Sequence, residues 1–173
     1  MKKIVLASIA VLLVLILVTG LSIFLHMPKT AYILTEDLYN NFKLKKELES
    51  QYNKVTSKRK AILDSLKFDL QLKYNALQSG KSKLSLKEFE ILRNQYTQKQ
   101  SQFDDDNNAL SQEYKDQIWK RLNQYVKEYG KNKSYTYIYG VIGQGELLYA
   151  EESKNITPDL IVFVNAKYEG DIK

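Results

Sequence analysis

The stretch LKYNALQSGKSKLSLKEFEIL, residues 72–92, decides the fold, because one periodic apolar pattern ends in it and another begins. On both sides, apolar residues recur at spacings of three, four and seven, which indicates one buried face of a helix. The first pattern extends from Thr35 to Leu77 and the second from Leu86 to Tyr129. Small and polar residues separate the two patterns. The sequence therefore predicts two helical arms of nearly equal length, within residues 35–130, folded back on each other with a tip near residues 78–85.

The ends of the two predicted helices carry residues typical of helix caps. Thr35, followed by two acidic residues, predicts an N-cap for the first arm. Ser85 and Glu88 have the spacing of a capping box for the second arm, and Gly130 predicts its C-terminal end. Polar side chains interrupt the apolar seam, so we expect the arms to bend or breathe where contacts are lost. These interruptions are Arg59, Lys73, Lys99 and Asn107.

Short runs rich in β-branched and aromatic residues flank the hairpin and predict three strands. The strands are Ala31–Leu34, Tyr135–Tyr139 and Leu147–Ala150, with a glycine-rich turn over residues 140–145 between the last two. Thr157 and Pro158 then predict the N-cap and first turn of a final helix. The fold class is therefore α+β, with residues 31–34 and 131–173 forming a small three-stranded β body with a C-terminal helix. Because one short helix cannot cover both faces of three strands, we expect the body to self-associate.

Residues 1–27 predict a signal peptide or a membrane anchor. Lys2 and Lys3 precede an apolar run over residues 4–25, which is long enough to cross a bilayer as a helix. A signal peptide has a shorter apolar region and a small-residue cleavage site, and the sites offered near Gly20 are poor. Both readings place the amino end in the cytoplasm and send the rest of the chain outward.

The net charge of +6 is unevenly distributed along the chain. Residues 43–103 hold 14 Lys and Arg against 6 Asp and Glu, whereas residues 104–130 hold 4 against 6. The basic excess therefore belongs to the outer part of the hairpin. Basic surfaces suit nucleic acid, anionic lipid or an acidic protein. With three Arg and no motif that interleaves them with aromatic residues, nucleic acid is the least favoured of these partners.

Residues that usually carry catalysis or bind metal are scarce in this chain. There is no Cys, and His26, the one His, stands alone at the edge of the apolar run. The run Asp104–Asp106 would point in three directions on a helix, which does not gather ligands around a cation. No glycine-rich phosphate loop is present. We therefore expect neither an enzyme nor a cofactor.

The order of strand, long helical hairpin, strands and short helix resembles the Skp/OmpH family of periplasmic chaperones. The resemblance covers Ala31 to Tyr168 and is most recognisable in three segments, Tyr135–Gly140, Gly145–Ala150 and Asn155–Leu160. It implies a homotrimer in which a small β body carries three helical arms. It also implies that the arms enclose unfolded outer-membrane proteins without using ATP. Typical members of the family are soluble after signal cleavage, whereas residues 4–25 of this chain could instead tether it to the inner membrane.

The resemblance leads to two sets of expected contact residues. The basic arms would capture clients through long-range attraction, although a solvated face is the simpler explanation of such lysines. The expected client contacts are Lys67, Lys73, Lys81, Lys83, Lys87 and Arg93. The expected oligomerisation contacts are Ile33, Tyr137, Ile138, Tyr139, Leu147 and Leu148. The alternative is a single-pass membrane scaffold protein whose periplasmic coiled coil is a spacer that binds a partner, in a parallel or partner-dependent coil.

Overall fold

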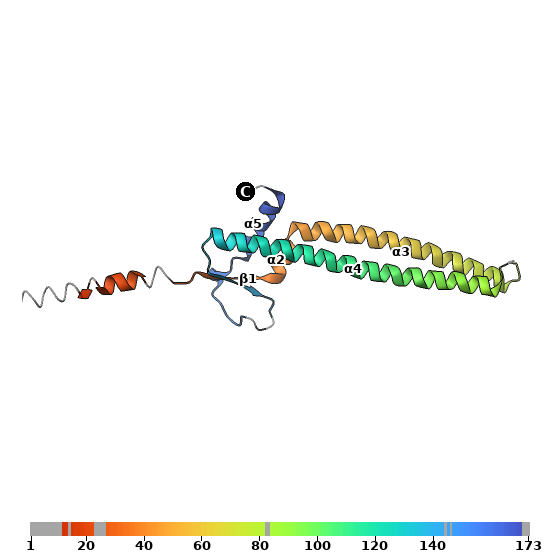
Figure 1. The fold of residues 1–173 in the computed structure, drawn as a ribbon, viewed down its shortest axis with the longest axis horizontal. Coiled ribbons are helices and arrows are strands. Elements are labelled where there is room, and N and C mark those ends of the chain that lie inside the picture. Colours follow the sequence, from red (N-terminus) through yellow and green to blue (C-terminus); the bar gives the residue numbers. More distant parts are fainter. Residues whose placement is uncertain are drawn as a thin grey trace, which may run out of the picture.

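The computed structural model describes residues 12–13, 15–22, 27–81, 84–143, 145 and 147–170. The chain is mostly helical, with two long helices and a small two-stranded sheet. The helices are α2 (Thr35–Asn41), α3 (Lys43–Gln78), α4 (Leu86–Asn132) and α5 (Thr157–Glu169), with a short 3₁₀ helix η1 (Glu152–Lys154). The strands are β1 (Thr30–Leu34) and β2 (Tyr137–Val141). Figure 1 shows α3 and α4 side by side, extending away from a body made of the other elements.

The predicted helical hairpin is confirmed. Helix α3 has 36 residues and α4 has 47, so at 1.5 Å per residue they extend about 54 Å and about 70 Å. The extra length of α4 continues into the body. At the start of α4 the predicted capping box is also confirmed: Glu88 N–H donates to Ser85 Oγ at 3.2 Å, and Ser85 N–H donates to Glu88 Oε2 at 2.8 Å. The hydrogen bonds from Ser85 hold the pKa of Glu88 below its ordinary value.

The first arm is not one continuous helix, which corrects the prediction of a single arm from Thr35. Phe42 has an extended backbone (φ −77°, ψ 127°) and separates α2 from α3. Its side chain is fully buried, with its ring 6.2 Å from that of Tyr125. The Asn165 side chain of α5 accepts from Lys43 N–H at 2.8 Å and donates to the Asn41 carbonyl at 3.0 Å. These bonds replace helical ones, so the chain can turn without Gly or Pro.

Gly130 does not end α4, which is a second correction. The helix continues to Asn132, and Ser134, at φ 56°, takes the left-handed conformation that usually falls to glycine after a helix. Tyr135 N–H donates to the Gly130 carbonyl at 2.9 Å, closing the last turn. A Cβ at Gly130 would lie 3.4 Å from Ile138 Cδ1 of β2, an ordinary van der Waals distance, so the end of the helix depends on Ser134 rather than on this glycine.

The sheet has two strands rather than three. β1 and β2 are parallel, with Thr30 opposite Tyr137 and Leu34 opposite Val141. The predicted third strand, residues 147–150, is wrong: these residues have no strand structure, and Leu148 is 92 % exposed. Gly143 and Gly145 have the positive φ that turns use, but with no strand at 147–150 to pair with β2 the predicted hairpin does not form. A strand-like sequence forms a strand only with a partner to pair with, and within the described residues this segment has none.

Thr157 ties α5 to the sheet and is not the N-cap predicted from the sequence. The N-cap is Ile156, and Thr157 is the first helical residue. The buried Thr157 hydroxyl accepts from Leu34 N–H at 2.9 Å and donates to Asn155 Oδ1 at 2.6 Å. The Thr35 cap is likewise wrong, since Leu34 is the N-cap of α2 and Thr35 begins the helix.

The segment before α5 covers the edge of β1 that does not pair with β2. Ile156 N–H donates to the Tyr32 carbonyl of β1 at 3.0 Å.

The hydrophobic core lies where the hairpin meets the body. It joins side chains of β1, α2, α5, the segments next to them and the roots of α3 and α4. These core residues are Ala31, Ile33, Leu38, Phe42, Leu48, Ile118, Leu122, Tyr125, Tyr129, Ile156, Leu160 and Val164. Most of the predicted signal or anchor, residues 1–27, lies outside the described residues. The part of it that is described includes residues 12–13 and 15–22, which are helical. Among the residues described, no helix is both long enough and apolar enough to span a membrane.

Candidate functional site

The outer half of the hairpin is held together by a thin apolar seam. Leu66 and Leu70 of α3 face Leu92 and Tyr96 of α4 around a groove of about 250 Å³. Nearer the tip, the rings of Tyr74 and Phe89 lie 5.7 Å apart. None of these seam residues is among the buried core residues. The outer seam therefore has less buried apolar surface to hold it than the root, where the core residues lie.

Large apolar side chains also lie outside the seam on this half of the hairpin. Phe68 is 66 % exposed and Leu72, one turn further along α3, is 51 % exposed. Leu86 and Ile91 are exposed on α4. None of these four residues is among the contact residues predicted from the sequence. Phe68 and Leu72 are four positions apart and do not belong to the seam pattern of Leu66 and Leu70. Their spacing therefore indicated a second apolar surface on the same helix.

The predicted client-contact cations are mostly free on the surface. Lys67, Lys81, Lys87 and Arg93 are exposed, and no ion pair holds them within the described part of the chain. Lys73 differs, because it is half-buried and pairs with Asp69 on the same helix. Lys83 lies outside the described residues. The structure thus places four of the six residues where a partner can reach their charge.

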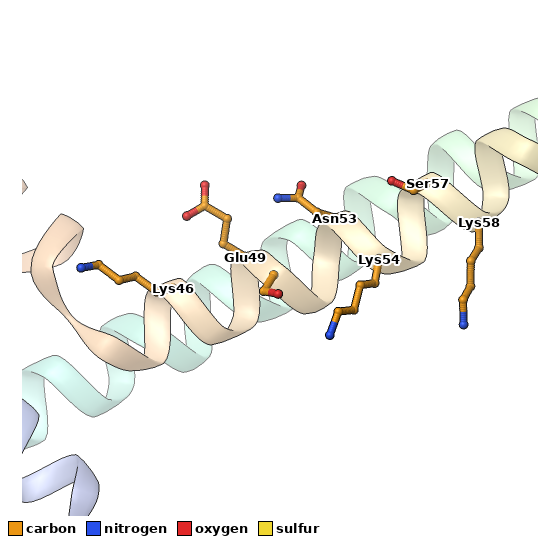
Figure 2. A pocket seen from close by; sticks show the side chains of 7 residues that line it. Lys46, Glu49, Asn53, Lys54, Ser57 and Lys58 are labelled. Carbon is orange, nitrogen blue, oxygen red and sulfur yellow. The ribbon is translucent and has the colours of Figure 1, made fainter.

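A further row of cations follows α3 toward the body. Lys46, Lys54 and Lys58 line a shallow surface together with Glu49 and Asn53, all from this one helix. Figure 2 shows Lys54 and Lys58 directed to one side of α3, with Glu49 and Asn53 directed to the other. With no opposing wall, this surface can attract a charged partner but cannot enclose it.

A polar layer crosses the seam at mid-arm. Arg59 of α3 donates to Asn107 Oδ1 at 2.6 Å and lies 3.5 Å from Asp106 Oδ2. Its guanidinium also lies over the Phe103 ring of α4, 5.7 Å from the centroid. Two of the predicted seam interruptions therefore pair with each other. Asp106, from the acidic run considered as a cation site, is used in this layer, whereas Asp104 and Asp105 are exposed.

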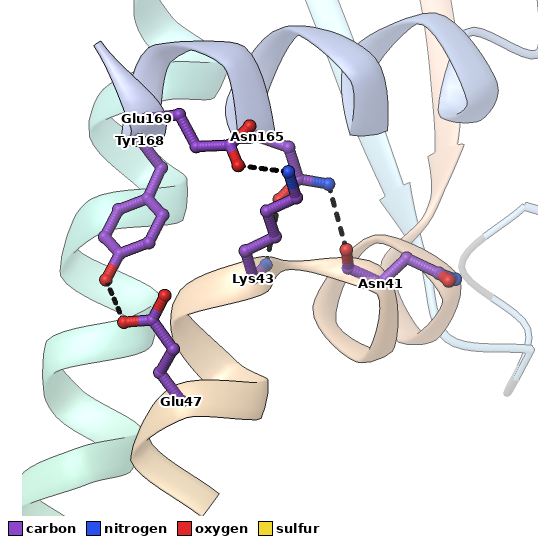
Figure 3. A network of polar contacts seen from close by, with 6 residues as sticks. All are labelled: Asn41, Lys43, Glu47, Asn165, Tyr168 and Glu169. Carbon is purple, nitrogen blue, oxygen red and sulfur yellow. Dashed lines mark hydrogen bonds and ion pairs between the residues drawn. The ribbon is translucent and has the colours of Figure 1, made fainter.

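The root of the arm is fixed to α5 by a polar network (Figure 3). Tyr168 donates to Glu47 Oε2 at 2.6 Å, and Lys43 forms an ion pair with Glu169. The hydrogen bond to the Glu47 carboxylate, with burial, raises the pKa of Tyr168 to about 12. Asn165 lies in the same network, bridging Asn41 and Lys43. The angle at which the arm leaves the body is therefore set by side chains of α5.

The predicted oligomerisation residues are not all on the surface. Ile33 is buried in the core of the chain itself, and Ile138 packs partly against it. Tyr137 and Tyr139 are exposed, and their rings stack at 6.1 Å. Leu148 is exposed and Leu147 is half-buried. The exposed members gather on β2 and the segment after it, where the outer edge of β2 has no pairing strand among the described residues.

These features define a class of proteins in which a long helical hairpin with a cationic outer half projects from a small sheet-and-helix body. The sequence matches the family of outer membrane proteins described as OmpH-like over residues 29–162, and the chain belongs to that family. A crystal structure described as that of an OmpH-like outer membrane chaperone from Caulobacter crescentus has the same fold. The two structures match with a TM-score of 0.62 at 12 % sequence identity, and the match covers 82 % of this chain and 86 % of that one. No curated protein matches the sequence significantly.

Proposed function

We propose that this chain is a trimeric, ATP-independent chaperone of the periplasm that holds unfolded outer-membrane proteins between its helical arms. The observation that carries the proposal is the alternation of exposed apolar and exposed cationic side chains on the outer half of the hairpin. Phe68 follows Lys67 on α3, and Lys87 follows Leu86 on α4. Membership of the OmpH-like family supports a chaperone for outer-membrane proteins at the level of the family.

The chemistry of the arm suits a client that is unfolded. Strands of outer-membrane barrels alternate apolar and polar residues, so an unfolded barrel presents both kinds along its length. Isolated exposed charges contribute only about 0–1 kcal/mol each. Retention therefore depends on many weak contacts, and the positive field mainly speeds capture. No enclosed pocket is required for this mode of binding.

The body supports the trimer in this proposal. Residues 31–34 and 131–173 would form the oligomerisation body, with β2 presenting an unpaired edge and the exposed rings of Tyr137 and Tyr139. Exposed strand edges pair readily with other chains, and three copies would cover them. The scaffold alternative requires a parallel or partner-dependent coil, and the folded-back hairpin of α3 and α4 does not supply one.

The place of action in this proposal is the periplasm. The chain would reach it either as a soluble protein after removal of residues 1–27 or tethered to the inner membrane by residues 4–25. Mass spectrometry of the mature amino terminus from envelope fractions separates the two. An intact Met1 indicates the tether, whereas a start between residues 21 and 28 indicates the soluble form.

Client holding is tested by light scattering of a urea-unfolded outer-membrane protein diluted into buffer with the full chain and no ATP. The wild-type chain should suppress aggregation at low salt and lose effect as salt screens the lysines. Replacing the three tip lysines, Lys81→Glu, Lys83→Glu and Lys87→Glu, should weaken suppression several-fold. The same number of substitutions at the body, Lys131→Glu, Lys133→Glu and Lys154→Glu, is the charge-matched control.

The apolar contribution is tested with Phe68→Ser and Leu72→Ser together, which remove exposed side chains and should leave the fold intact. Suppression should again fall. Absence of suppression by the wild-type chain, or equal loss in the tip and body variants, would refute the role proposed for the arm. Sizing of the full chain by light scattering at micromolar concentration tests the assembly, and a monodisperse monomer would refute the trimer.

A further inference from the structure

A tyrosine-lined groove lies between the roots of the two long helices. Tyr39 of α2, Tyr52 of α3 and Tyr114 of α4 form its walls, and its volume is about 230 Å³. The buried side chains of Leu48 and Ile118 lie at its floor. We call this site the root groove. It lies beside the core, where packing holds the walls in place, unlike the sparsely buried seam near the tip.

The size and lining of the root groove limit what can occupy it. Sites for whole small molecules have volumes of about 300–1,000 Å³, so this groove suits one or two side chains. Tyrosine rings offer aromatic faces and edges, which favour another aromatic ring over an aliphatic group of similar size. Trp119 extends this aromatic surface, because its ring stacks on that of Tyr39 at 5.2 Å. The groove therefore favours an aromatic side chain.

The rim of the root groove carries an uncompensated positive charge. Lys45 pairs with Glu49 at 2.8 Å on the α3 side. Lys115, on the α4 side, is exposed and has no ion pair in the part of the chain that the structure describes. A ligand that places an aromatic ring in the root groove would therefore complement this rim best if it also carried a carboxylate close to the ring.

We propose that the root groove binds an aromatic side chain flanked by acidic residues in an extended segment of an unfolded outer-membrane protein. The inference rests on the proposed function and adds a selective contact to the non-selective arm. Outer-membrane barrels carry girdles of aromatic residues at both membrane interfaces, so every client supplies aromatic side chains along its length. The arm would then collect the client, and the root groove would hold particular segments of it beside the body.

The test uses a dye-labelled, tryptophan-free peptide that alternates Glu and Val around one central Phe, and a second peptide with Leu in place of Phe. Anisotropy measures the affinity of each peptide for the full chain. Emission of Trp119, the one Trp in the chain, reports whether the peptide enters the root groove. The Phe peptide should bind about threefold to tenfold more tightly than the Leu peptide and shift the Trp119 emission.

Three variants locate the effect. Tyr52→Ser should abolish the preference for Phe, whereas Tyr96→Ser, in the outer groove of about 250 Å³, should preserve it. Lys115→Glu, a surface change that leaves the packing intact, should lower the affinity of the chain for both acidic peptides. Equal affinity for the two peptides, an unchanged Trp119 emission on binding, or full preference in Tyr52→Ser would each overturn the proposal.

Failure of the root groove is distinguishable from failure of client holding. If the wild-type chain suppresses client aggregation but binds the two peptides equally, the proposed function stands and the root groove is not selective. If the chain binds the Phe peptide selectively but suppresses no aggregation, the proposed function is refuted. An unfolded outer-membrane protein is then also refuted as the ligand of the groove.

Discussion

Tyr168 shows how a single side chain fixes the arm to the body. Its hydroxyl donates to Glu47 on α3, while its ring lies 5.6 Å from that of the buried Phe42. The phenol must stay protonated to donate this bond, and the bond in turn raises its pKa to about 12. One residue of α5 therefore contacts both the break between α2 and α3 and the first turn of α3 beyond it.

Tyr168→Phe keeps the ring and removes the hydroxyl. At neutral pH the free energy of unfolding should fall by about 1 kcal/mol, below the range of about 1.5–3 kcal/mol for a hydrogen bond to a charged group, because the site is partly exposed. The folded pKa lies above the unfolded value of 10, so the bond stabilises the fold below pH 10 and its contribution is lost between pH 10 and about 12. Denaturant unfolding of both chains at pH 8 and pH 11.5 measures this, and a difference that does not shrink at high pH would contradict it.

Gly140 is required by the close approach of two chain segments. A Cβ at this position would lie 2.9 Å from Thr35 Oγ1, closer than atoms can pack without movement. Gly140→Ala should therefore lower the free energy of unfolding by about 1–3 kcal/mol, as overpacking does. Thr35→Ala removes the opposing oxygen, and Thr35 makes no capping bond to lose. The double variant should recover most of the stability in thermal unfolding, and a strictly additive loss would show that this contact is not the cause.

The residues that sequence reasoning identified correctly are those that interact locally. Ser85 and Glu88 are three positions apart, so their spacing alone predicted the capping box. Asn165 and Asn41 are 124 positions apart, and nothing in either local sequence indicates that an amide from α5 replaces helical bonds at Phe42. The break between α2 and α3 was missed for that reason. Thr157 was read as a local cap, whereas its hydroxyl accepts from Leu34, 123 positions away.

At the level of elements, the seam between α3 and α4 combines an apolar root, a polar layer and a thin outer part. Arg59, Asp106 and Asn107 satisfy one another, so the interruption predicted from the sequence is a hydrogen-bonded layer rather than a gap. Replacing such a layer with apolar residues is often neutral or stabilising. The layer therefore gives a way to tighten the arm without changing its exposed surface.

Arg59→Leu combined with Asn107→Leu should stabilise the hairpin and slow its opening. We expect hydrogen exchange of outer-half amides to slow about tenfold, since about 1.4 kcal/mol corresponds to that factor. Arg59→Leu alone should instead speed exchange, because it leaves the half-buried Asn107 amide without its partner, whereas Asp106 is 44 % exposed and is hydrated in both variants. If the double variant exchanges as fast as the wild-type chain, the polar layer does not control breathing of the arm.

The strands show where a pattern of residues is not sufficient. Residues 147–150 have the composition of a strand, yet β1 is already flanked by β2 and by the segment before α5. A single chain offers them no edge except that of β2, and the glycine-rich residues between do not form the hairpin needed to reach it. For these residues, tertiary contacts decided the outcome. Gly130 failed as a helix stop for a local reason, because the left-handed conformation falls at Ser134 and Tyr135 N–H closes the last turn on the Gly130 carbonyl.

For the whole molecule, the distribution of charge and burial separates the roles of its two ends. The core and the polar network gather at the root, whereas the outer half of the hairpin carries exposed cations beside exposed apolar side chains and no core residue. The root is stable enough to hold a fixed geometry, and the outer half offers a surface for many weak contacts. The hairpin and its basic bias were both predictable from sequence, because periodicity and charge are local quantities. The second apolar surface at Phe68 and Leu72 was not identified as a contact surface, because its importance depends on which helix face the seam occupies.

The central claim, that the outer half of the hairpin binds unfolded clients, is tested most directly by site-specific photo-cross-linking. A photoreactive amino acid replaces Phe68 on the arm in one full-length chain and Val162, equally exposed on α5 of the body, in another. Each chain is mixed with an unfolded outer-membrane protein at low salt and irradiated. We predict a strong client adduct at position 68 and little at position 162, with the first lost at high salt. No client adduct at position 68, or equal adducts at both positions, would contradict the claim.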